Sequence, residues 1–465
     1  MLRESEKDTI VAISTPPGEG GIGIVRLSGD RSLPIADEIF AARSGKKAED
    51  QKNFTARVGH AMFSGPPPAV IDEALLLVMR APKSYTGEDM AEISAHGGTR
   101  VLEAIVESAV QAGARPAGPG EFTKRAFLNG RMDLVQAEAV LDLIRAKTEL
   151  ARRWAASQLE GTLTQKVRAV QDRLVEALSH LEAAIDFPDD EVRPARPSEM
   201  QNRLREICGE LADLLAGSRM GILAKQGLRA VITGRPNVGK SSLMNGLLRS
   251  PRVIVTSYPG TTRDVVEETV QVHGFPVHLA DTAGIQETEH PVEKEGIERS
   301  KKAIERADLI LFVLDGSRPL SAEDKKLLEL LPEDTPRVLV LNKSDLSGQI
   351  KKEDLKNWAG AVVLETSCLL GKGFEELGEE IFRIITKGKM LAGEPVAISS
   401  LRQKDLVEKA LGSAKRAAES CRDGLSAEFC AADVRVAIGY LGEIVGDVVT
   451  DDVLNVLFSQ FCIGK

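Results

Sequence analysis

The amino-acid sequence predicts a multidomain chain: an N-terminal α+β domain, an all-helical domain split in two, and an α/β domain inserted between its halves. The first observation is a glycine-rich loop at residues 234–241, which follows the apolar run 228–233. The second is the range 131–187, which has a helical pattern, no proline and one glycine, Gly161. The third is the return of helical patterns after residue 386.

With 465 residues the chain is longer than a domain with a single hydrophobic core usually is, so two or three domains are expected. The expected borders give an N-terminal domain at 1–129, a first helical part at 130–226, a nucleotide domain at 227–386 and a second helical part at 387–465.

Charge and cysteine usage narrow the class of protein. The 60 basic and 69 acidic residues give a net charge of −9, so a nucleic-acid partner would need a local basic patch or a second protein. Five scattered cysteines without metal-ligand spacing indicate reduced thiols. The charged N-terminus lacks a signal-peptide core, and no run of about 18 apolar residues follows. We therefore expect a soluble, cytoplasmic protein with no membrane segment.

The N-terminal segment alternates strand-like runs with turns. Strands are expected at 9–14, 22–27 and 74–79, and apolar residues at helical spacing predict a helix at 99–111. Glycines 18, 20, 21 and 23 suggest a dinucleotide fingerprint, but a strand-like segment follows them where that motif needs a helix, so this interpretation is rejected.

The remaining chain is predicted to be helical outside the nucleotide domain. A single helix across 131–187 would be unusually long, so a break is expected near Gly161. Further helices are expected at 199–215, 404–418, 431–445 and 451–461.

The loop 234–241 has the strand, loop and helix context of a phosphate-binding loop. Its glycines let backbone N–H groups surround an oxyanion, and the helix that follows directs its positive dipole end there. Lys240 adds a charge beside the outer phosphates, and the Ser241 hydroxyl can complete the ligand shell of Mg²⁺.

Two further motifs follow expected strands, where an open α/β sheet places its ligand residues. In the first, residues 281–284, Asp281 can hold Mg²⁺ through water and the Gly284 N–H can meet a γ-phosphate. In the second, residues 342–345, Asn342 and Asp345 can read a guanine edge, because a carboxylate accepts from both N1–H and the 2-amino group. The predicted substrate is GTP rather than ATP.

One departure from a Ras-like pattern concerns hydrolysis. Ile285 stands where many GTPases carry a glutamine that orients the attacking water. Asn237 offers a hard carbonyl oxygen suited to a cation without fixed geometry, and the segment 256–264 adds hydroxyls and carbonyls that could close over the nucleotide. The predicted GTP-binding residues are Asn237, Val238, Gly239, Lys240, Ser241, Ser242, Thr256, Ser257, Tyr258, Pro259, Gly260, Thr261, Thr262, Asp281, Thr282, Ala283, Gly284, Asn342, Lys343, Ser344 and Asp345.

These motifs resemble those of the MnmE (TrmE) tRNA-modification GTPase family, and the resemblance covers the whole chain. It includes Gly-Thr-Thr-Arg-Asp at 260–264, Asp-Thr-Ala-Gly-Ile at 281–285, the stretches 15–18, 85–89 and 119–122, and the ending Phe-Cys-Ile-Gly-Lys at 461–465. It implies an N-terminal folate-binding and dimerisation domain, a split helical domain and an inserted P-loop GTPase domain.

The resemblance also implies a homodimeric GTPase that uses K⁺ in place of an arginine finger. By position, K⁺ is expected at Asn237, Thr256, Tyr258 and Thr261, and Mg²⁺ at Ser241 and Thr262. Glu293 matches the family's catalytic acid that orients water. Two alternatives stay open: Glu293 as a solvated surface carboxylate, and Arg263 as an arginine finger.

The expected one-carbon carrier is a tetrahydrofolate, in its 5,10-methylene or 5-formyl form. Arg26, Glu92, Arg131 and Lys465 match the family's ligand positions, with Arg131 replacing a lysine of some relatives. The alternative is that Arg26 and Glu92 form only a surface ion pair.

Among the cysteines, Cys462 is open to two interpretations: a catalytic thiol that reaches the folate site, or a thiol buried in the apolar stripe of the last helix. Cys421 and Cys430 are interpreted as helix-packing residues. His96, which precedes two glycines, is the one histidine singled out for a test near the folate.

The function implied by the resemblance is GTP hydrolysis coupled to tRNA modification. With the FAD-dependent partner MnmG (GidA), the enzyme would add a carboxymethylaminomethyl or aminomethyl group to C5 of the wobble uridine (U34) of certain tRNAs. The alternative is a K⁺-dependent ribosome-assembly or regulatory GTPase, which would not need the folate-like domain or the Cys-Ile-Gly-Lys ending.

Overall fold

The computed structural model describes residues 8–65, 67–186, 197–249, 253–255, 267–281, 302–350, 354–355, 358, 361–387 and 398–465. The chain divides into two compact units. The first holds Met1–Leu141, Gln158–Gln171 and Ile438–Lys465, and the second holds Asp142–Ser157 and Asp172–Ala437. The domain borders expected at residues 129, 226 and 386 stay a prediction.

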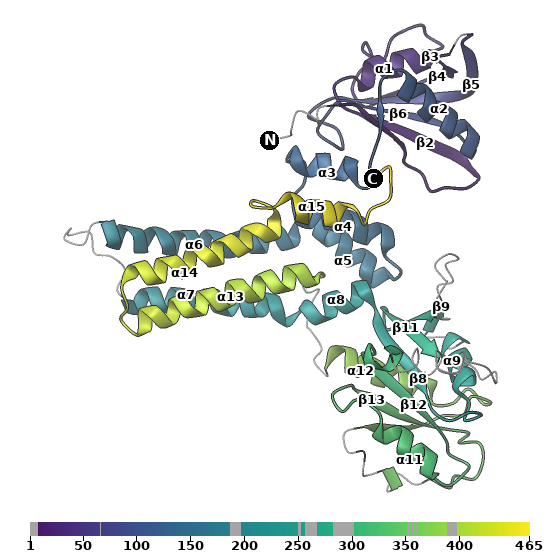
Figure 1. Cartoon of the computed structure of the whole chain (residues 1–465), viewed down its shortest axis with the longest axis vertical. Helices are drawn as coiled ribbons and strands as arrows, with labels where there is room; N and C mark the ends of the chain where they lie inside the picture. Colours follow the sequence, from purple (N-terminus) through teal and green to yellow (C-terminus); the bar gives the residue numbers. More distant parts are fainter. Residues whose placement is uncertain are drawn as a thin grey trace. The chain divides into compact units, whose positions relative to one another are not determined.

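The first unit contains a seven-stranded sheet in the order β3-β4-β5-β6-β2-β1-β7 (Figure 1). Every neighbouring pair is antiparallel except β1 and β7, which are parallel. The strands are β1 (Ile10–Ile13), β2 (Gly20–Ser28), β3 (Phe40–Ala42), β4 (Thr55–Phe63), β5 (Ala69–Met79), β6 (Met90–Gly97) and β7 (Arg115–Pro116). The expected strands at 9–14, 22–27 and 74–79 are therefore confirmed, and so is the rejection of the dinucleotide fingerprint.

Helices pack on one face of this sheet, and the other face carries Arg26 and Glu92. On one face, alternate residues such as Val25, Leu27 and Ile93 pack with α1 (Ser32–Ile39) and α2 (Thr99–Gln111), the helix expected at 99–111. Residues of opposite parity face the other way, because side chains alternate along a strand. Arg26 and Glu92 lie there, directly paired across β2 and β6.

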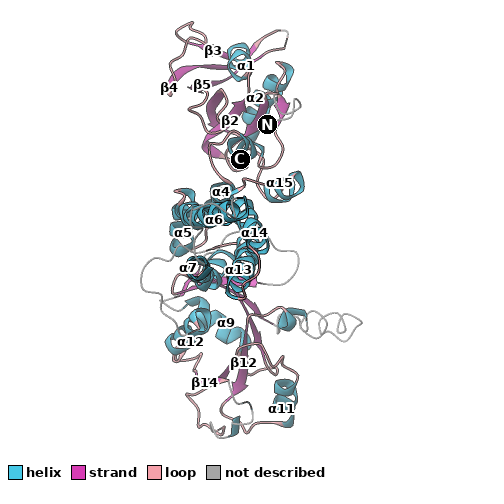
Figure 2. Cartoon of the chain, turned by 90° about the vertical axis from the view of Figure 1, so that its left-hand side faces the viewer, coloured by secondary structure: helices cyan, strands magenta, loops and turns pink. Residues whose placement is uncertain are grey.

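Helices make up the chain on both sides of the nucleotide domain. They are α3 (Glu121–Leu128), α4 (Leu134–Arg145), α5 (Glu149–Leu159), α6 (Thr162–Asp186), α7 (Pro197–Ala216), α8 (Ser218–Gln226), α13 (Leu401–Arg422), α14 (Ala427–Val445) and α15 (Asp451–Phe458). In the second unit α7 lies beside α13 (Figures 1 and 2). Helix α7 precedes the nucleotide domain in the chain, and α13 follows it. The helical domain is thus built from both sides of the insertion, as predicted.

The break expected near Gly161 is confirmed, because this residue has a φ of +86° between α5 and α6. A second break, between Arg145 and Glu149, was not predicted. The helix expected at 451–461 is shorter than predicted and ends at Phe458. Among the helices that the structure describes, none is both long enough and apolar enough to span a membrane.

The nucleotide domain is a second seven-stranded sheet in the order β14-β13-β12-β8-β11-β10-β9. Its strands are β8 (Leu228–Thr233), β9 (Val253–Val255), β10 (Glu267–Val272), β11 (Phe275–Asp281), β12 (Leu309–Asp315), β13 (Arg337–Asn342) and β14 (Val362–Glu365). The five strands from β14 to β11 are parallel, whereas β10 and β9 add an antiparallel edge.

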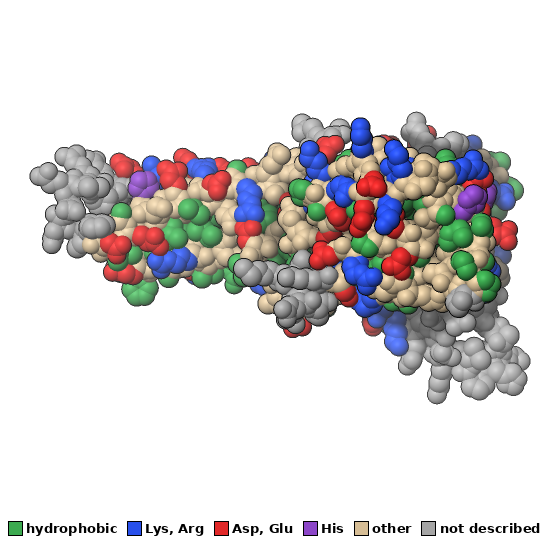
Figure 3. All heavy atoms as spheres, turned by 90° about the horizontal axis from the view of Figure 1, so that it is seen from above, with side chains coloured by type: hydrophobic (Ala, Val, Ile, Leu, Met, Phe, Trp, Pro, Cys, Tyr) green, Lys and Arg blue, Asp and Glu red, His purple; other side chains and the backbone are tan. Residues whose placement is uncertain are grey.

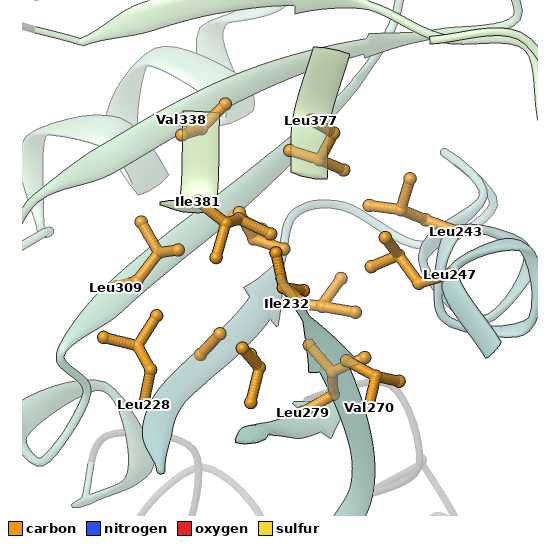
Figure 4. Packing of buried hydrophobic residues seen from close by; sticks show 14 of the residues in the cluster. Leu228, Ile232, Leu243, Leu247, Val270, Leu279, Leu309, Val338, Leu377 and Ile381 are labelled. Atoms are coloured by element: carbon orange, nitrogen blue, oxygen red, sulfur yellow. The ribbon is translucent and has the colours of Figure 1, made fainter. Parts of the chain in front are cut away.

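Helices close the core of this domain. They include α9 (Lys240–Arg249), α11 (Ala322–Glu329) and α12 (Phe374–Thr386). Leu243 of α9 and Leu377 and Ile381 of α12 point among strand residues such as Ile232 and Leu279 (Figure 4). Each fully buried side chain of this kind contributes about 1.5–3 kcal/mol. This packing fixes the carboxyl ends of the parallel strands, where the predicted motifs lie.

Candidate functional site

The loop between β8 and α9 has a backbone that only glycine tolerates at two positions. Gly234 has a φ of +142° and Gly239 a φ of +101°. A Cβ on Gly234 would overlap the Val313 carbonyl oxygen, and one on Gly239 would overlap Nδ2 of Asn342. The two glycines therefore allow the loop to pass close beneath β12 and the end of β13.

Side chains hold the carbonyl oxygens of this loop. The buried Lys240 donates from Nζ to the oxygens of Gly234 and Arg235, each over 2.9 Å. Nδ2 of Asn342 donates to the Val238 oxygen over 3.0 Å. Because these oxygens are engaged elsewhere, the loop can present N–H groups to an anion.

Ser241 and Asp281 bring two hard oxygens together at the start of α9. Ser241 Oγ donates to Oδ2 of Asp281 over 2.9 Å, and Asp281 is 9% exposed at the end of β11. A hydroxyl and a carboxylate beside a phosphate loop fit the oxygen ligands that Mg²⁺ prefers. The other predicted Mg²⁺ ligand, Thr262, lies outside the described residues.

The two residues predicted to read guanine are Asn342, which ends β13, and Asp345, which follows it. Oδ1 of Asn342 accepts from the Cys368 N–H over 3.3 Å, and Oδ1 of Asp345 accepts from the Ser367 hydroxyl. Between them, Lys343 has a φ of +66° and its Nζ lies 2.6 Å from Oδ2 of Asp315. Burial tends to raise the pKa of Asp315, but hydrogen bonds from Lys343 and Ser317 outweigh it and lower that pKa.

A cavity of about 620 Å³ extends from the phosphate loop to the end of β13. Its lining includes the predicted residues Asn237, Gly239, Lys240, Ser241, Ser242, Asn342, Lys343 and Asp345. Val238 is buried, and the Ser344 N–H donates to the Thr366 oxygen over 3.0 Å. Predicted residues outside the described ranges are Thr256, Ser257, Tyr258, Pro259, Gly260, Thr261, Thr262, Thr282, Ala283, Gly284, Glu293 and the alternative Arg263.

Four lining residues are absent from the predicted set: Pro236, Leu346, Cys368 and Leu369. Cys368 and Leu369 follow β14, the outer parallel strand, so its apolar run followed by Thr-Ser-Cys carried the same signal as the other two motifs. Burial raises the pKa of the Cys368 thiol, although a hydrogen bond with Asn342 opposes this.

A second candidate site lies in the first unit around Arg26. Nε of Arg26 donates to Oε1 of Glu92 over 2.7 Å, and the two side chains are 17% and 14% exposed. The Arg26 guanidinium lies 5.4 Å from the ring centre of Tyr85 and 5.6 Å from that of Phe122. Arg26 and Glu92 therefore form the ion pair of the alternative interpretation, but this pair is mostly buried rather than on the surface. Their role as folate ligands stays a prediction.

The C-terminal tail reaches this site. Nη1 of Arg26 donates to the Gly464 oxygen over 3.4 Å, and the Phe122 N–H donates to the Lys465 oxygen over 3.1 Å. Gly464 has a φ of +94°, and a Cβ there would overlap the Ile13 carbonyl oxygen. Cys462 is exposed, so the interpretation of a thiol buried in the apolar stripe is wrong.

Other predicted residues have partners of their own. Nε of Arg131 donates to the Ser84 oxygen over 2.9 Å. Nδ1 of the exposed His96 lies 2.8 Å from Oδ1 of Asp72. The sulfurs of Cys421 and Cys430 lie 2.8 Å apart, one on α13 and one on α14, which fits the helix-packing interpretation.

An α/β sheet with a phosphate loop, the Ser241–Asp281 pair and the Asn-Lys-Ser-Asp motif 342–345 at its carboxyl edge is the architecture of a P-loop GTPase. The model of the MnmE helical domain matches residues 134–462, and that of the GTP-binding protein TrmE N-terminus matches residues 9–131. The chain belongs to the MnmE family of tRNA modification GTPases.

Three relatives called tRNA modification GTPase MnmE match almost end to end. The protein of Clostridioides difficile (strain 630) is 44% identical over 459 residues, which are 98% of this chain and 99% of that protein. The Symbiobacterium thermophilum protein is 45% identical, with coverage of 99% and 100%. The Geobacter metallireducens protein is 45% identical, with coverage of 99% for both.

Proposed function

We propose that this chain is a K⁺-activated GTPase that modifies tRNA in the cytoplasm. With an FAD-dependent partner of the MnmG (GidA) type, it adds a carboxymethylaminomethyl or aminomethyl group to C5 of the wobble uridine (U34), using a tetrahydrofolate one-carbon unit. The observation that carries this proposal is the single cavity that joins the phosphate loop to Asn342 and Asp345, in a chain that matches tRNA modification GTPases along its length.

Guanine selectivity follows from the chemistry of the cavity. Asp345 presents a carboxylate that accepts from N1–H and the 2-amino group together, which adenine does not offer. The Ser367 hydroxyl donates to one of its oxygens and orients it. Asn342 is 2% exposed and is held by Val238 and Cys368, so its amide is fixed before the base arrives.

Two cations are proposed at the phosphates. Ser241, with Asp281 beside it and Thr262 from the undescribed segment, would hold Mg²⁺. Asn237 lines the cavity, and its amide oxygen would hold K⁺ together with Thr256, Tyr258 and Thr261. A cation held there supplies positive charge where the transition state develops negative charge. Glu293 is proposed to orient the attacking water.

The folate is proposed to bind around Arg26 and Glu92, with Arg131 and Lys465 as further ligands. A pterin presents an N–H and an amino group side by side, which one carboxylate such as Glu92 can accept together. Arg26 holds the Glu92 carboxylate in place through a hydrogen bond of 2.7 Å. The exposed thiol of Cys462, in the tail that contacts Arg26, is proposed to take part in the modification chemistry.

A homodimer formed through the N-terminal domain is supported by exposed apolar residues on its sheet. Val58 of β4 and Leu75 of β5 are cross-strand partners and are 42% and 45% exposed, and Ile22 of β2 is 68% exposed. Exposed apolar groups on neighbouring strands suit burial against a second copy.

The charge distribution agrees with a partner that contributes much of the tRNA contact. On the face seen in Figure 3, Lys and Arg side chains of the N-terminal domain are interspersed with Asp and Glu. A mixed surface in a chain of net charge −9 would attract a polyanion weakly.

Nucleoside analysis of tRNA from a strain that lacks the gene tests the function. The expected result is loss of the C5 modification at the wobble uridine, restored by the wild-type gene and not by one encoding Asp281→Asn. Normal wobble uridines in the deletion strain, with a ribosome-assembly defect or none, would favour the alternative of a ribosome-assembly or regulatory GTPase.

A further inference from the structure

Arg235 belongs to the phosphate loop, but its side chain contacts a different element. Nε of Arg235 donates to Oδ1 of Asp324 on α11 over 2.7 Å. The side chains are 22% and 2% exposed, so this ion pair is mostly removed from water. A buried carboxylate that lost its cation would be strongly destabilised, so the pair ties the loop firmly to α11.

Asp324 is itself fixed at the first turn of α11. Its Oδ2 accepts from the N–H and the hydroxyl of Ser321 over 3.1 and 2.7 Å, and its own N–H donates to the Ser321 hydroxyl over 3.1 Å. This is a reciprocal capping box, which satisfies two donors at the helix start. Both carboxylate oxygens are therefore engaged, one with the helix cap and one with Arg235.

The anchored residue lies two positions before Asn237. Pro236 between them has a fixed φ, which removes one of the backbone rotations between the anchored residue and Asn237. Asn237 has a φ of +62°, which is uncommon for a residue other than glycine and needs support from its surroundings. On the other side, Nζ of Lys343 donates to the Asn237 oxygen over 3.2 Å.

We infer that Arg235 and Asp324 form a positioning pair that holds the loop so that the Asn237 amide faces the cavity, and thereby sets the K⁺ requirement of the site. Neither side chain is among the residues that line the cavity, so both act through Asn237. This inference rests on the proposed K⁺ activation.

Asp324→Asn tests the pair, because it removes the charge and keeps the shape of the side chain. The matched control is Ser321→Ala, which removes the capping hydroxyl and leaves the contact of Arg235 with Asp324. Arg235→Lys is the second variant, since it leaves the cap intact but lacks the guanidinium. The readouts are the K⁺ concentration for half-maximal binding of fluorescent GDP with aluminium fluoride, the GDP affinity in NaCl, and the thermal midpoint.

We expect Asp324→Asn and Arg235→Lys to raise the half-maximal K⁺ concentration about tenfold, because small displacements of a positioned ligand are costly. GDP affinity in NaCl should stay within about twofold, since the phosphate N–H groups remain. Ser321→Ala should lower the thermal midpoint without changing the K⁺ requirement.

An unchanged K⁺ requirement in both pair variants, with a wild type that responds to K⁺, would overturn the inference alone. An equal rise in Ser321→Ala would also overturn it, because helix stability would then explain the effect. A wild type that binds the aluminium fluoride complex equally in NaCl and KCl would contradict the proposed K⁺ activation and the inference together. If Asp324→Asn does not fold, the half-maximal K⁺ concentration of Arg235→Lys alone decides whether the inference holds.

Discussion

Oγ of Ser241 donates a 2.9 Å hydrogen bond to Oδ2 of Asp281, although the two residues are 40 positions apart. The contact exists because β8 and β11 are parallel neighbours, so the loop after β8 begins beside the residue that ends β11. A hydroxyl and a carboxylate from two adjacent strand ends can therefore share one hydrated divalent cation.

Ser241→Ala should remove most of the gain in GTP affinity that Mg²⁺ supplies. Loss of an oxygen ligand or its support typically costs 10- to 100-fold, so we expect the affinity in Mg²⁺ to fall by about that factor. Titration of a fluorescent GTP analogue in Mg²⁺ and in EDTA measures the gain. Thr386→Ala is the control, because its hydroxyl donates to the Phe382 oxygen on α12. Equal Mg²⁺ gains in wild type and Ser241→Ala would contradict the assignment.

Asp345→Asn should change the preferred base from guanine to xanthine. The amide NH₂ can donate to the 2-oxygen of xanthine but cannot accept from the 2-amino group of guanine, so we expect GTP affinity to fall at least about 100-fold while XTP binding appears. Competition between the two nucleotides checks this. Ser367→Ala, which removes the hydroxyl that orients Asp345, should weaken GTP binding without a gain in XTP. Retained GTP preference in Asp345→Asn would rule out this base contact.

Arg26→Ala and Glu92→Gln should each weaken folate binding. Both remove a charge from a mostly enclosed pair, so we expect a loss of about tenfold or more in affinity for 5-formyl-tetrahydrofolate. Equilibrium dialysis with the full chain measures it. Arg43→Ala is the matched control, since Arg43 and Glu73 form a pair whose side chains are 60% and 53% exposed. Similar affinities in all three variants would place the folate elsewhere.

Gly464→Ala should loosen the C-terminal tail. The new Cβ would overlap the Ile13 oxygen at a φ of +94°, so the tail cannot keep its place. Hydrogen exchange of the Phe122 amide, which donates to the Lys465 oxygen, should accelerate. Gly412→Ala on α13 has its nearest contact at 3.8 Å and should leave this exchange unchanged. Slow exchange at Phe122 in Gly464→Ala would show that the tail is not held by this contact.

The acid stability of the first unit should depend on Arg115. The hydrogen bond from Arg115 lowers the pKa of the Asp8 carboxyl. Burial tends to raise the pKa of the Glu121 carboxyl, but the hydrogen bond from Arg115 and other contacts outweigh burial, so that this pKa is lowered too. A carboxyl whose folded pKa is lowered adds stability above its unfolded pKa and loses it as the pH falls through the folded value.

Calorimetry from about pH 6 to about pH 3 covers that window, since unfolded Asp and Glu titrate near 3.9 and 4.3. The thermal midpoint of Arg115→Ala should fall less with acid than that of the wild type. Arg100→Ala, which breaks an exposed pair with Glu103, should follow the wild type. Parallel curves for Arg115→Ala and the wild type would contradict this role.

The elements that could be predicted from sequence are those whose pattern is local. The break at Gly161 was predictable because a lone glycine interrupts a long helical pattern, whereas the break after Arg145 has no glycine or proline to mark it. Strands β3 and β4 were missed because they depend on neighbours far along the chain. Strand β6 was missed although its residues 91–96 alternate between apolar and polar side chains.

The candidate site was predictable to the extent that its motifs are contiguous. Asn342 and Asp345 share one motif, but Cys368 joins them only because β14 lies beside β13. The pairing of Arg235 with Asp324 spans 89 positions and follows from packing, which no local pattern encodes. The exposure of Cys462 likewise depends on where the tail lies.

GTP turnover in KCl and in NaCl, for the wild type and for Asn237→Ala, tests the central claim most directly. The account predicts that KCl accelerates the wild type at least about tenfold over NaCl, because the bound cation supplies positive charge beside the phosphates, and that Asn237→Ala loses this difference. Equal wild-type turnover in the two salts, or full K⁺ activation without the Asn237 amide, would contradict it.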